Sequence, residues 1–408
     1  MMIYDVIIIG GGASGIMAAL SASNFTDKIL IIEKNNRIGK KILVTGNGRC
    51  NFTNITMKNT DYNNPEFVKD VFEQFDVHDT IDYFDSLGIV AKIEDEGKTY
   101  PLSEQASSFL DVFLYELNKK KINIVLEQNV SSVSNAKDIF SVRTDTNQLY
   151  KGKTVILATG GKSMPLTGSN GSGLDIASNL GHRIINTFPA LVKLKLDSPY
   201  LKQLAGLKIN SQVDLLLGEE TIQSEYGDIL FANYGISGPT ILELSRKANE
   251  LLKINKEVFL RIILIQSISK QKIMERLDRF LDREISQALI GLVHKRLINV
   301  LIKEAGIEKN NLLVKDIPKE QIYRLIDLFY DWRLVVKGSL GFEESQVTAG
   351  GIDVSEVSSK TLESKLVSDL FFTGEVLDID GRCGGYNLQW AWSSGYLAGK
   401  YASERALK

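Results

Sequence analysis

The sequence has few of the residues that commonly hold metals or form disulfides. Its 408 residues include two cysteines, Cys50 and Cys383, and three histidines, His78, His182 and His294. Two distant cysteines make neither a disulfide framework nor a CxxC redox pair, and the scattered histidines lack the spacing of metal ligands. A disulfide scaffold, a zinc site and a dithiol redox centre are therefore not expected.

Excess charge and long apolar runs are also missing. The net charge is −2, and the hydrophobic and charged contents of 44% and 24% are ordinary for a globular protein of two or three domains. No strong field attracts nucleic acid or an anionic membrane, and no apolar run reaches the roughly 18 residues of a membrane span. The apolar N-terminal run contains Asp5 and is cut short by glycines, unlike a signal peptide. We expect a cytoplasmic protein with neither a membrane nor a nucleic-acid partner; its oligomeric state stays open.

The first 34 residues carry the most informative motif. An apolar run at 4–9 leads into Gly10-Gly11-Gly12-Ala13-Ser14-Gly15, and a small-residue helical segment follows to Ala22. A second apolar run at 28–32 ends at Glu33, which precedes Lys34. Strand, glycine turn, helix, strand and acid in this order are typical of a site for the ADP half of a dinucleotide. The alternative is a glycine turn in an ordinary βαβ unit that binds nothing.

Each part of this motif has a physical role. Gly10 permits the tight turn, Gly12 lets the backbone approach a pyrophosphate, and Gly15 lets the helix pack close to the sheet. The helix N-terminus offers unpaired N–H groups and the positive end of its dipole to the phosphates. Glu33 lies 18 residues after Gly15, where a carboxylate accepts hydrogen bonds from a ribose diol and repels a 2′-phosphate. The motif therefore favours FAD or NAD over NADP.

The hydrophobic pattern predicts an α/β chain interrupted by an insertion. We expect a discontinuous cofactor domain at 1–190 and 343–408, an inserted β domain at 191–267 and 331–342, and a helical subdomain at 268–330. Within the first part, helices are expected over Pro65–Gly88 and Ala106–Lys121, and strands over Ile122–Val133, Ile139–Thr144, Gln148–Lys151 and Lys153–Gly161, the last ending in glycines. Within the insertion, short strands are expected over Leu191–Leu196, Lys208–Leu217 and Thr221–Ser224. Near the C-terminus we expect a strand at 369–373 and a helix at 390–401.

Three strands end in glycine, and together they narrow the cofactor to FAD. They are Ile9-Gly10, Leu157-Ala158-Thr159-Gly160 and Phe372-Thr373-Gly374-Glu375. In flavoproteins with two dinucleotide-binding folds, the first of these positions holds the pyrophosphate and the second is a turn that crosses toward the cofactor. The third presents an acid to the ribityl chain. A nicotinamide dehydrogenase needs no terminal Thr-Gly-Glu strand. The alternative for Glu375 is a surface acid or a helix cap.

Longer motifs resemble a known family. The segment Arg37–Asn54 is similar to the YhiN/BaiN-type NAD(P)/FAD-dependent oxidoreductases, and so are Gly350–Ile352, Thr361–Lys365, Gly374–Asp378, Gly381 and Gly384–Gln389. The resemblance spans almost the whole chain. It implies a Rossmann-like FAD-binding domain built from both termini, with inserted β-barrel-like and helical domains. Members of this family include a bile-acid dehydro-steroid reductase and an aminoacetone oxidase.

The loop Thr45–Asn54 is rich in polar groups and glycine, which suits the edge of a flavin ring. Arg49 in this loop would stabilise an anionic reduced flavin; the alternative is a polar surface loop. Cys50 is expected to be a packed small residue rather than a nucleophile. The expected cofactor-binding residues are Gly10, Gly12, Ala13, Ser14, Gly15, Glu33, Lys34, Lys40, Thr45, Gly46, Gly48, Arg49, Cys50, Asn51, Val130, Ala158, Thr159, Gly160, Gly374, Glu375, Gly385, Tyr386, Asn387 and Leu388.

No catalytic acid or base is identified; the candidates for a catalytic role are Arg49, Asn233 and Tyr386. The segment Leu230–Pro239 resembles a family segment that usually carries Thr-His where this chain has Ala232-Asn233. An amide does not titrate, so Asn233 cannot replace a histidine acid or base. Tyr386 faces substrate or belongs to the core. Gly168–Gly173 is expected to cap the next helix, near the cofactor or away from it.

The leading hypothesis is an FAD enzyme that moves a hydride between flavin and a small organic molecule, with NAD(P)H as a transient co-substrate. No second glycine motif of this kind is visible, so a dedicated nicotinamide domain is not expected. That absence also fits an amine oxidase of the aminoacetone-oxidase type that uses oxygen. A non-catalytic flavin-binding module is a third possibility, and near-neutral charge disfavours an RNA-modifying flavoprotein.

Overall fold

The computed structural model describes residues 2–136 and 138–408. Residues 1 and 137 fall in the expected cofactor domain and lie outside the described residues. The chain forms two units, one built from residues up to Pro189 together with Phe342–Lys408, and one from Ala190–Gly341. Each unit is described by itself.

The first unit is built on a seven-stranded sheet. The order is β6-β2-β1-β9-β8-β7, and β18 also pairs with β9. The pairs β1–β2, β1–β9, β2–β6 and β9–β18 are parallel, whereas β7–β8 and β8–β9 are antiparallel. The bounds are β1 Ile3–Ile9, β2 Ile29–Ile32, β6 Asn123–Val125, β7 Val130–Ala136, β8 Ile139–Thr144, β9 Leu149–Leu157 and β18 Leu370–Phe372.

The strand register determines where the glycine turns meet. Ile9 at the end of β1 pairs with Ile32 at the end of β2 and with Leu157 at the end of β9. Phe372 at the end of β18 also pairs with Leu157. The carboxyl ends of these parallel strands are therefore level, so the three glycine turns and Glu33 come together at one edge of the sheet. Ligands of open α/β sheets bind at such an edge.

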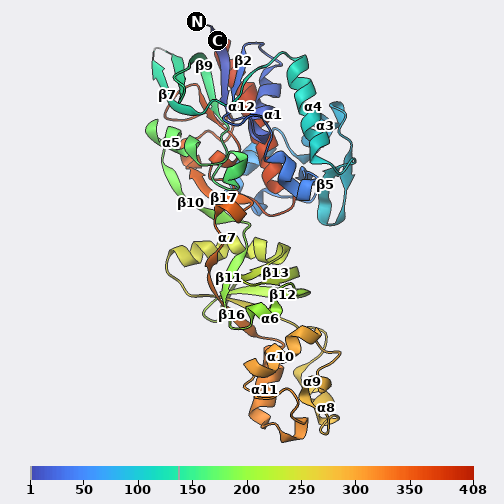
Figure 1. Ribbon diagram of the computed structural model, residues 1–408. Coiled ribbons are helices and arrows are strands. Elements are labelled where there is room, and N and C mark those ends of the chain that lie inside the picture. The colour runs from blue at the N-terminus through green and yellow to red at the C-terminus, as the bar shows by residue number, and fades with distance from the viewer. Residues whose placement is uncertain (1, 137) are drawn as a thin grey trace. The chain divides into compact units, whose positions relative to one another are not determined.

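Two helices from opposite ends of the sequence pack together over this sheet. Helix α1 spans Ala13–Ala22, and helix α12 spans Tyr386–Ala406. Figure 1 shows them side by side, and the Ser21 hydroxyl of α1 donates to the Tyr396 carbonyl of α12 over 2.7 Å. The Trp390 indole of α12 donates to the Gly374 carbonyl just after β18. Small residues in both helices allow this close packing, which joins the two ends of the chain in one domain.

The remaining elements of the first unit surround these layers. An aromatic core connects α12 to the nearby helices, with Phe84 lying between Phe52 and Trp392 at ring-centroid distances of 5.6 and 5.3 Å. The remaining helices and strands are α2 Pro65–Phe72, α3 Val77–Ser86, α4 Ala106–Lys119, α5 Ser172–Asn179, the sheet β3 Thr53–Asn54, β5 Lys98–Pro101 and β4 Ala91–Ile93, and the pair β10 Ile184–Ala190 and β17 Val347–Ile352.

Two expected elements of this unit are each split in two. The predicted helix at 65–88 ends at Phe72, and α3 begins after Asp76, whose carboxylate accepts from the backbone N–H groups of His78 and Asp79. Asp76 is therefore an N-cap, and a cap starts a new helix. The predicted strand at 122–133 is β6 and β7, which lie at opposite ends of the sheet order.

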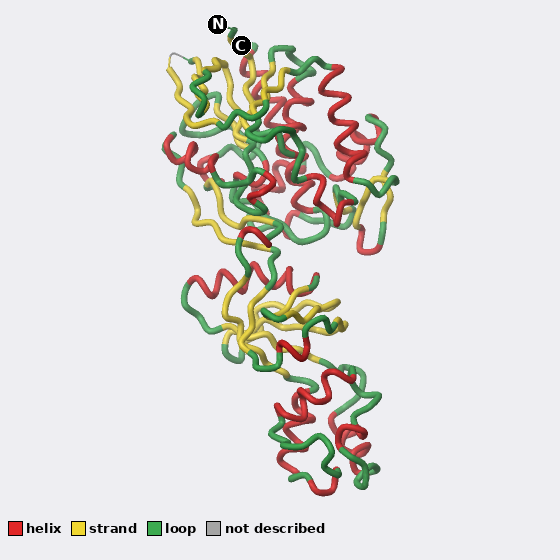
Figure 2. Tube along the Cα trace, viewed as in Figure 1, coloured by secondary structure: helices red, strands yellow, loops and turns green. Residues whose placement is uncertain are grey.

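The second unit contains a closed barrel in the order β11-β14-β13-β12-β15-β16. Figure 2 shows its strands in yellow, and α8–α11 form a separate group of helices. The short strand expected at 221–224 is part of a longer strand that pairs with β12 along its length. The bounds are β11 Leu194–Asp197, β12 Lys208–Leu217, β13 Glu220–Ala232, β14 Gly235–Ser237, β15 Val258–Ile263, β16 Trp332–Ser339, α6 Leu201–Leu204, α7 Pro239–Lys253, α8 Lys270–Asp278, α9 Ile285–Ala288, α10 Lys295–Glu304 and α11 Lys319–Leu328.

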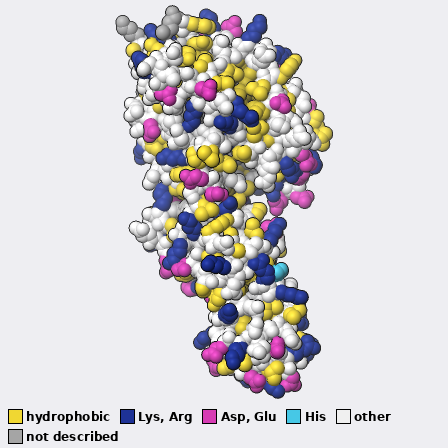
Figure 3. All heavy atoms as spheres, viewed as in Figure 1, with side chains coloured by type: hydrophobic (Ala, Val, Ile, Leu, Met, Phe, Trp, Pro, Cys, Tyr) yellow, Lys and Arg dark blue, Asp and Glu magenta, His cyan; other side chains and the backbone are white. Residues whose placement is uncertain are grey.

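The α/β fold class with inserted barrel and helical parts is thus confirmed. Across the described part of the chain, no helix combines the length and apolar character that crossing a bilayer requires. Among the same residues, no group of three or more His, Cys, Asp or Glu side chains is arranged to hold a metal ion. On the face shown in Figure 3, basic and acidic side chains are interspersed rather than gathered in a single-sign stripe.

Candidate cofactor site

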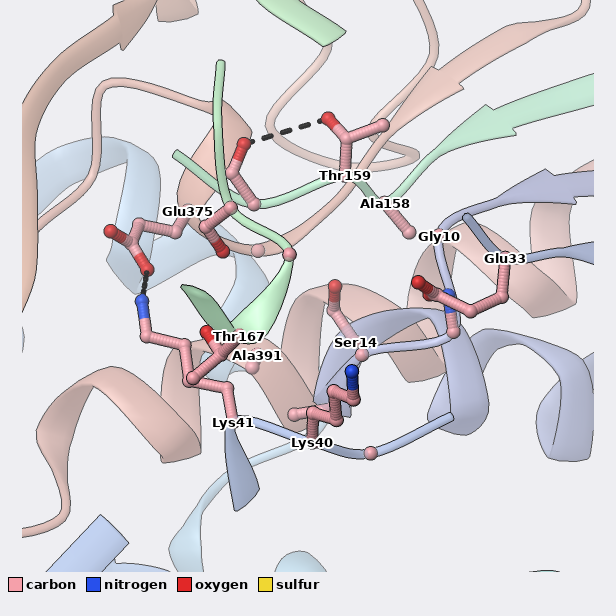
Figure 4. Close-up of a pocket in the computed structure, with 18 of the residues that line it drawn as sticks. Gly10, Ser14, Glu33, Lys40, Lys41, Ala158, Thr159, Thr167, Glu375 and Ala391 are labelled. Carbon is pink, nitrogen blue, oxygen red and sulfur yellow. Dashed lines mark hydrogen bonds and ion pairs between the residues drawn. The ribbon is translucent and has the colours of Figure 1, made fainter. Parts of the chain in front are cut away.

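A large cavity lies where the glycine turns meet. It encloses about 1230 Å³ of empty space, part of it open to solvent, and its lining includes Gly10–Ser14, Glu33–Asn35, Ala158–Gly160, Gly374–Glu375 and Asn387–Leu388. The lining runs from Glu33 to Glu375, two residues that follow different strands of the sheet, so the cavity suits an extended ligand. Figure 4 shows the Glu375–Lys41 pair at one end, Glu33 at the other, and Ser14 and Lys40 between them.

Glu33 forms one end of the cavity, and its carboxylate is tightly held. Its Oε2 accepts from the Gly11 N–H over 2.8 Å, and its Oε1 accepts from the Asn35 N–H over 2.8 Å and from the Asn35 side-chain amide over 2.7 Å. Burial lowers the pKa of neighbouring Lys34, although the Glu33 carboxylate opposes this effect. A carboxylate offers about four acceptor positions. Three are filled by the protein, so Glu33 can accept about one hydrogen bond from a ligand.

The middle of the cavity is formed by the glycine turn and the N-terminus of α1. Gly12 is the N-cap of α1 and makes no side-chain capping bond, because it has no side chain. A Cβ added to Gly12 would meet nothing within 4 Å, whereas a Cβ on Gly15 would lie 2.0 Å from the Gly10 carbonyl oxygen. Gly12 therefore opens on the cavity and Gly15 packs against the chain. Exposed N–H groups at a helix N-terminus suit an anionic group such as a pyrophosphate.

Glu375 forms the other end of the cavity, and it is ion-paired. Its Oε2 lies 2.8 Å from the Lys41 ammonium, and its Oε1 accepts from the Ser163 hydroxyl over 2.6 Å and from the Thr348 N–H over 2.7 Å. Burial alone would raise the pKa of Glu375, but Lys41 and the two other donors outweigh burial and lower it. Glu375 is therefore an anion with about one acceptor position left for a ligand hydroxyl.

The structure brings most of the expected cofactor residues to this cavity. Those that line it are Gly10, Gly12, Ala13, Ser14, Glu33, Lys34, Lys40, Thr45, Val130, Ala158, Thr159, Gly160, Gly374, Glu375, Asn387 and Leu388. Expected residues outside its lining are Gly15, Gly46, Gly48, Arg49, Cys50, Asn51, Gly385 and Tyr386. Apart from Gly15 in α1, the outer group belongs to the loop after Thr45 and to the start of α12.

Three expected site residues of the first unit have other partners. Arg49 lies 2.5 Å from Glu94 and 4.0 Å from the ring centre of Tyr100, so its charge is balanced outside the lining. Cys50 is fully buried, and burial raises the pKa of its thiol to about 12 although a hydrogen bond to Thr45 opposes this. Tyr386 is buried in the core. Asn233, the remaining catalytic candidate, follows β13 in the barrel unit.

Several lining residues were missed by the sequence reasoning. They include Asn35, Arg37, Lys41, Gln128, Thr167 and Gln346. The sequence gives one signal for two of them, because Asn35 and Arg37 follow the acid at the end of β2. The sequence led us to expect Lys40 and not its neighbour Lys41, because only the folded structure shows that the Lys41 ammonium reaches the Glu375 carboxylate. Thr167 ends the short 3-10 turn Pro165–Thr167, and Gln346 directly precedes β17; neither position carries a recognisable sequence pattern.

Comparisons with known proteins identify the family of this chain. A family model described as an HI0933-like protein Rossmann domain matches residues 4–401. This chain belongs to the HI0933-like family. As expected from the sequence, it is an oxidoreductase of the flavin-dependent class.

Two relatives align with the chain over nearly its whole length. A 3-dehydro-bile acid delta(4,6)-reductase of Clostridium scindens is 37% identical over 406 residues, covering 98% of both chains. A ribosomal RNA dihydrouridine synthase of Escherichia coli K12 is 32% identical over 402 residues, covering 96% of both chains. A solved 3-ketosteroid delta1-dehydrogenase of Sterolibacterium denitrificans is 11% identical with a TM-score of 0.50, covering 99% of this chain and 100% of that one. That structural likeness supports the fold alone.

Proposed function

We propose that the cavity holds FAD, with its adenosine ribose at Glu33, its pyrophosphate at Gly12 and the N-terminus of α1, and its ribityl chain at Glu375. Three features support this fit: one acceptor position left on each acid, open space beside Gly12, and a helix N-terminus between the two acids. When bound, FAD would accept a hydride from a donor and pass it to an acceptor. The protein residues bind and orient it.

The ring end is proposed to lie near the N-terminus of α12. This helix starts at Tyr386 after Gly385, which makes no side-chain capping bond. The Asn387 side chain donates to the carbonyls of Gly381 and Arg382 and accepts from the Gly381 N–H, so it holds the preceding turn in place. The first N–H groups of α12 and the positive end of its dipole would stabilise negative charge on a reduced flavin.

We further propose that the enzyme reduces a carbon–carbon double bond conjugated to a carbonyl in a small cyclic molecule. The observation that carries this proposal is the reaction shared by the two named relatives. A delta(4,6)-reductase acting on a 3-oxo steroid and a synthase that makes dihydrouridine both saturate such a bond. A hydride is added at the β-carbon and a proton at the α-carbon. NAD(P)H is the proposed source of the electron pair.

The test begins with the flavin and continues with a substrate panel. Flavin released from purified protein is identified, and the reconstituted protein is supplied without oxygen with NADH or NADPH. A 3-oxo-Δ4 steroid is compared with its saturated ketone and with a primary amine. Loss of the conjugated double bond from the steroid, with no reaction of the saturated ketone, supports the proposal. Reduction of the flavin by the amine alone would support the oxidase alternative instead.

A second candidate substrate is a uridine base in ribosomal RNA. The ribosomal RNA dihydrouridine synthase of E. coli, which aligns over 96% of both chains, supports this alternative. The interspersed charges in Figure 3 do not form the basic stripe typical of nucleic-acid binding proteins. The higher identity to the C. scindens reductase favours the small molecule. Dihydrouridine formation in ribosomal RNA by the purified protein would reverse this preference.

A further inference from the structure

Every polar atom of Asn35 takes part in a hydrogen bond, and two of these bonds are donated to Glu33. Its backbone N–H and its side-chain amide both donate to Glu33 Oε1, over 2.8 and 2.7 Å. The same amide also donates to the Thr167 carbonyl over 3.1 Å, and the side-chain oxygen accepts from the Lys40 ammonium over 3.3 Å. The Asn35 backbone carbonyl accepts from the Glu127 N–H over 3.0 Å. The half-buried Asn35 side chain therefore connects Glu33 with Lys40 and with the turn Pro165–Thr167.

These contacts determine which face of Glu33 is available. Oε1 accepts two bonds from Asn35, whereas Oε2 accepts one bond, from the Gly11 N–H. The remaining acceptor position is therefore on Oε2, on the side of the glycine turn. An amide is suited to this task because it donates to the carboxylate with one end and accepts from Lys40 with the other. Alanine could do neither, and aspartate would place a second negative charge against Glu33.

We propose that Asn35 is a positioning residue for the cofactor's adenosine ribose: it fixes the Glu33 carboxylate and fastens the 165–167 turn beside it. This role rests on the proposed binding of FAD in the cavity. It also gives a purpose to the loop around Gly168, because Thr167 contributes a carbonyl to the same network. Asn35 itself acts through Glu33, so its loss weakens FAD binding without removing the acid.

The test compares two substitutions of neighbouring asparagines. Asn35→Asp replaces the donor to Glu33 with an acceptor of the same size. Asn36→Asp introduces the same charge at an exposed position outside the cavity lining. FAD affinity of the full-length protein is measured by flavin fluorescence at about pH 8 and about pH 5.5, the range in which one of two facing carboxylates gains a proton.

We expect Asn35→Asp to weaken FAD binding at least about tenfold at the higher pH, as for a lost hydrogen bond to a charged group. Its affinity should recover at the lower pH, because a shared proton restores a donor between the two carboxyl groups. Asn36→Asp should match the wild type at both pH values. Asn35→Ala should lose affinity equally at both, because it has no group to protonate.

Two outcomes would overturn the inference. One is an FAD affinity of Asn35→Asp equal to that of Asn36→Asp, and the other is a loss that does not change with pH. If Asn35→Asp does not fold, Asn35→Ala decides: wild-type affinity overturns the positioning role, and a pH-independent loss supports it. Failure of the wild-type protein to bind FAD would instead refute the proposed function, so the two failures are distinguishable.

Discussion

Replacing Gly12 with alanine should weaken FAD binding while leaving the fold intact. Gly12 has φ −81° and ψ −170°, which alanine adopts without strain, and a Cβ there meets nothing within 4 Å. The cost in folding free energy is about 1 kcal/mol or less, since weaker capping is offset by a stiffer unfolded chain. The methyl group, however, occupies the open side where the pyrophosphate is proposed to approach. Losing one charge-assisted hydrogen bond costs roughly 1.5–3 kcal/mol, or about 10- to 150-fold in affinity.

Gly15→Ala is the matched control, with the opposite expectation. Its Cβ would lie 2.0 Å from the Gly10 carbonyl oxygen and 3.2 Å from the Ala158 side chain, so the backbone must move. Overpacking of this kind costs about 1–3 kcal/mol or more. The unfolding temperature of the apoprotein should therefore fall by several degrees in Gly15→Ala, and by about 3 °C or less in Gly12→Ala.

The assay measures both quantities on the same preparations. Thermal unfolding of the apoprotein reports stability, and titration with FAD followed by flavin fluorescence reports affinity. Wild-type FAD affinity of Gly12→Ala would show that the open side of Gly12 does not face the pyrophosphate. Destabilisation of Gly12→Ala as strong as that of Gly15→Ala would show that Gly12 does not open on free space.

Three further predictions concern titratable groups. Lys41→Met should destabilise the apoprotein by about 1–3 kcal/mol in thermal unfolding, because it leaves the half-buried Glu375 carboxylate without its ion-pair partner; adding Glu375→Gln should restore much of the loss. A thiol reagent at neutral pH should label half-exposed Cys383 and spare Cys50, whose thiol is buried with a pKa of about 12, as mass spectrometry would show. Burial lowers the pKa of His182 in the folded protein, although Glu356 opposes this effect. The stability that neutral His182 contributes to the fold is therefore complete above the unfolded-state pKa of about 6.5, and it is lost as the pH falls below that value. His182→Gln should flatten this part of the stability profile, and an unchanged acid slope would contradict the assignment.

The sheet and its glycine edge could be predicted because local signals and tertiary structure agree there. Apolar runs ending at Ile9, Ile32 and Leu157 form strands whose ends are level, so the residues after them meet. The hydrophobic pattern predicted the wrong helix bounds where a single polar capping residue interrupts a continuous helical periodicity. Asp76 begins a new helix inside an apparently single helical stretch, and its cap was hidden by the apolar residues on both sides.

The partners of charged side chains could not be predicted from the sequence. Arg49 was expected at the flavin ring, but the structure pairs it with Glu94 and stacks it on Tyr100, two residues about fifty positions away. Glu375 was expected as an acceptor for the ribityl chain, and the sequence gave no sign that Lys41 pairs with it. Such pairs depend on side-chain direction in loops, which neither spacing nor periodicity specifies.

In the proposed function, a flavin bound in this cavity delivers a hydride to a double bond conjugated to a carbonyl. The most direct test is a single turnover without oxygen, in which the reduced FAD-bound protein is mixed with an equal amount of a 3-oxo-Δ4 steroid. We expect the oxidised flavin spectrum to return while the saturated ketone appears in the same amount. A flavin that stays reduced with this steroid and with uridine-containing ribosomal RNA, and is reoxidised only by oxygen, would contradict it.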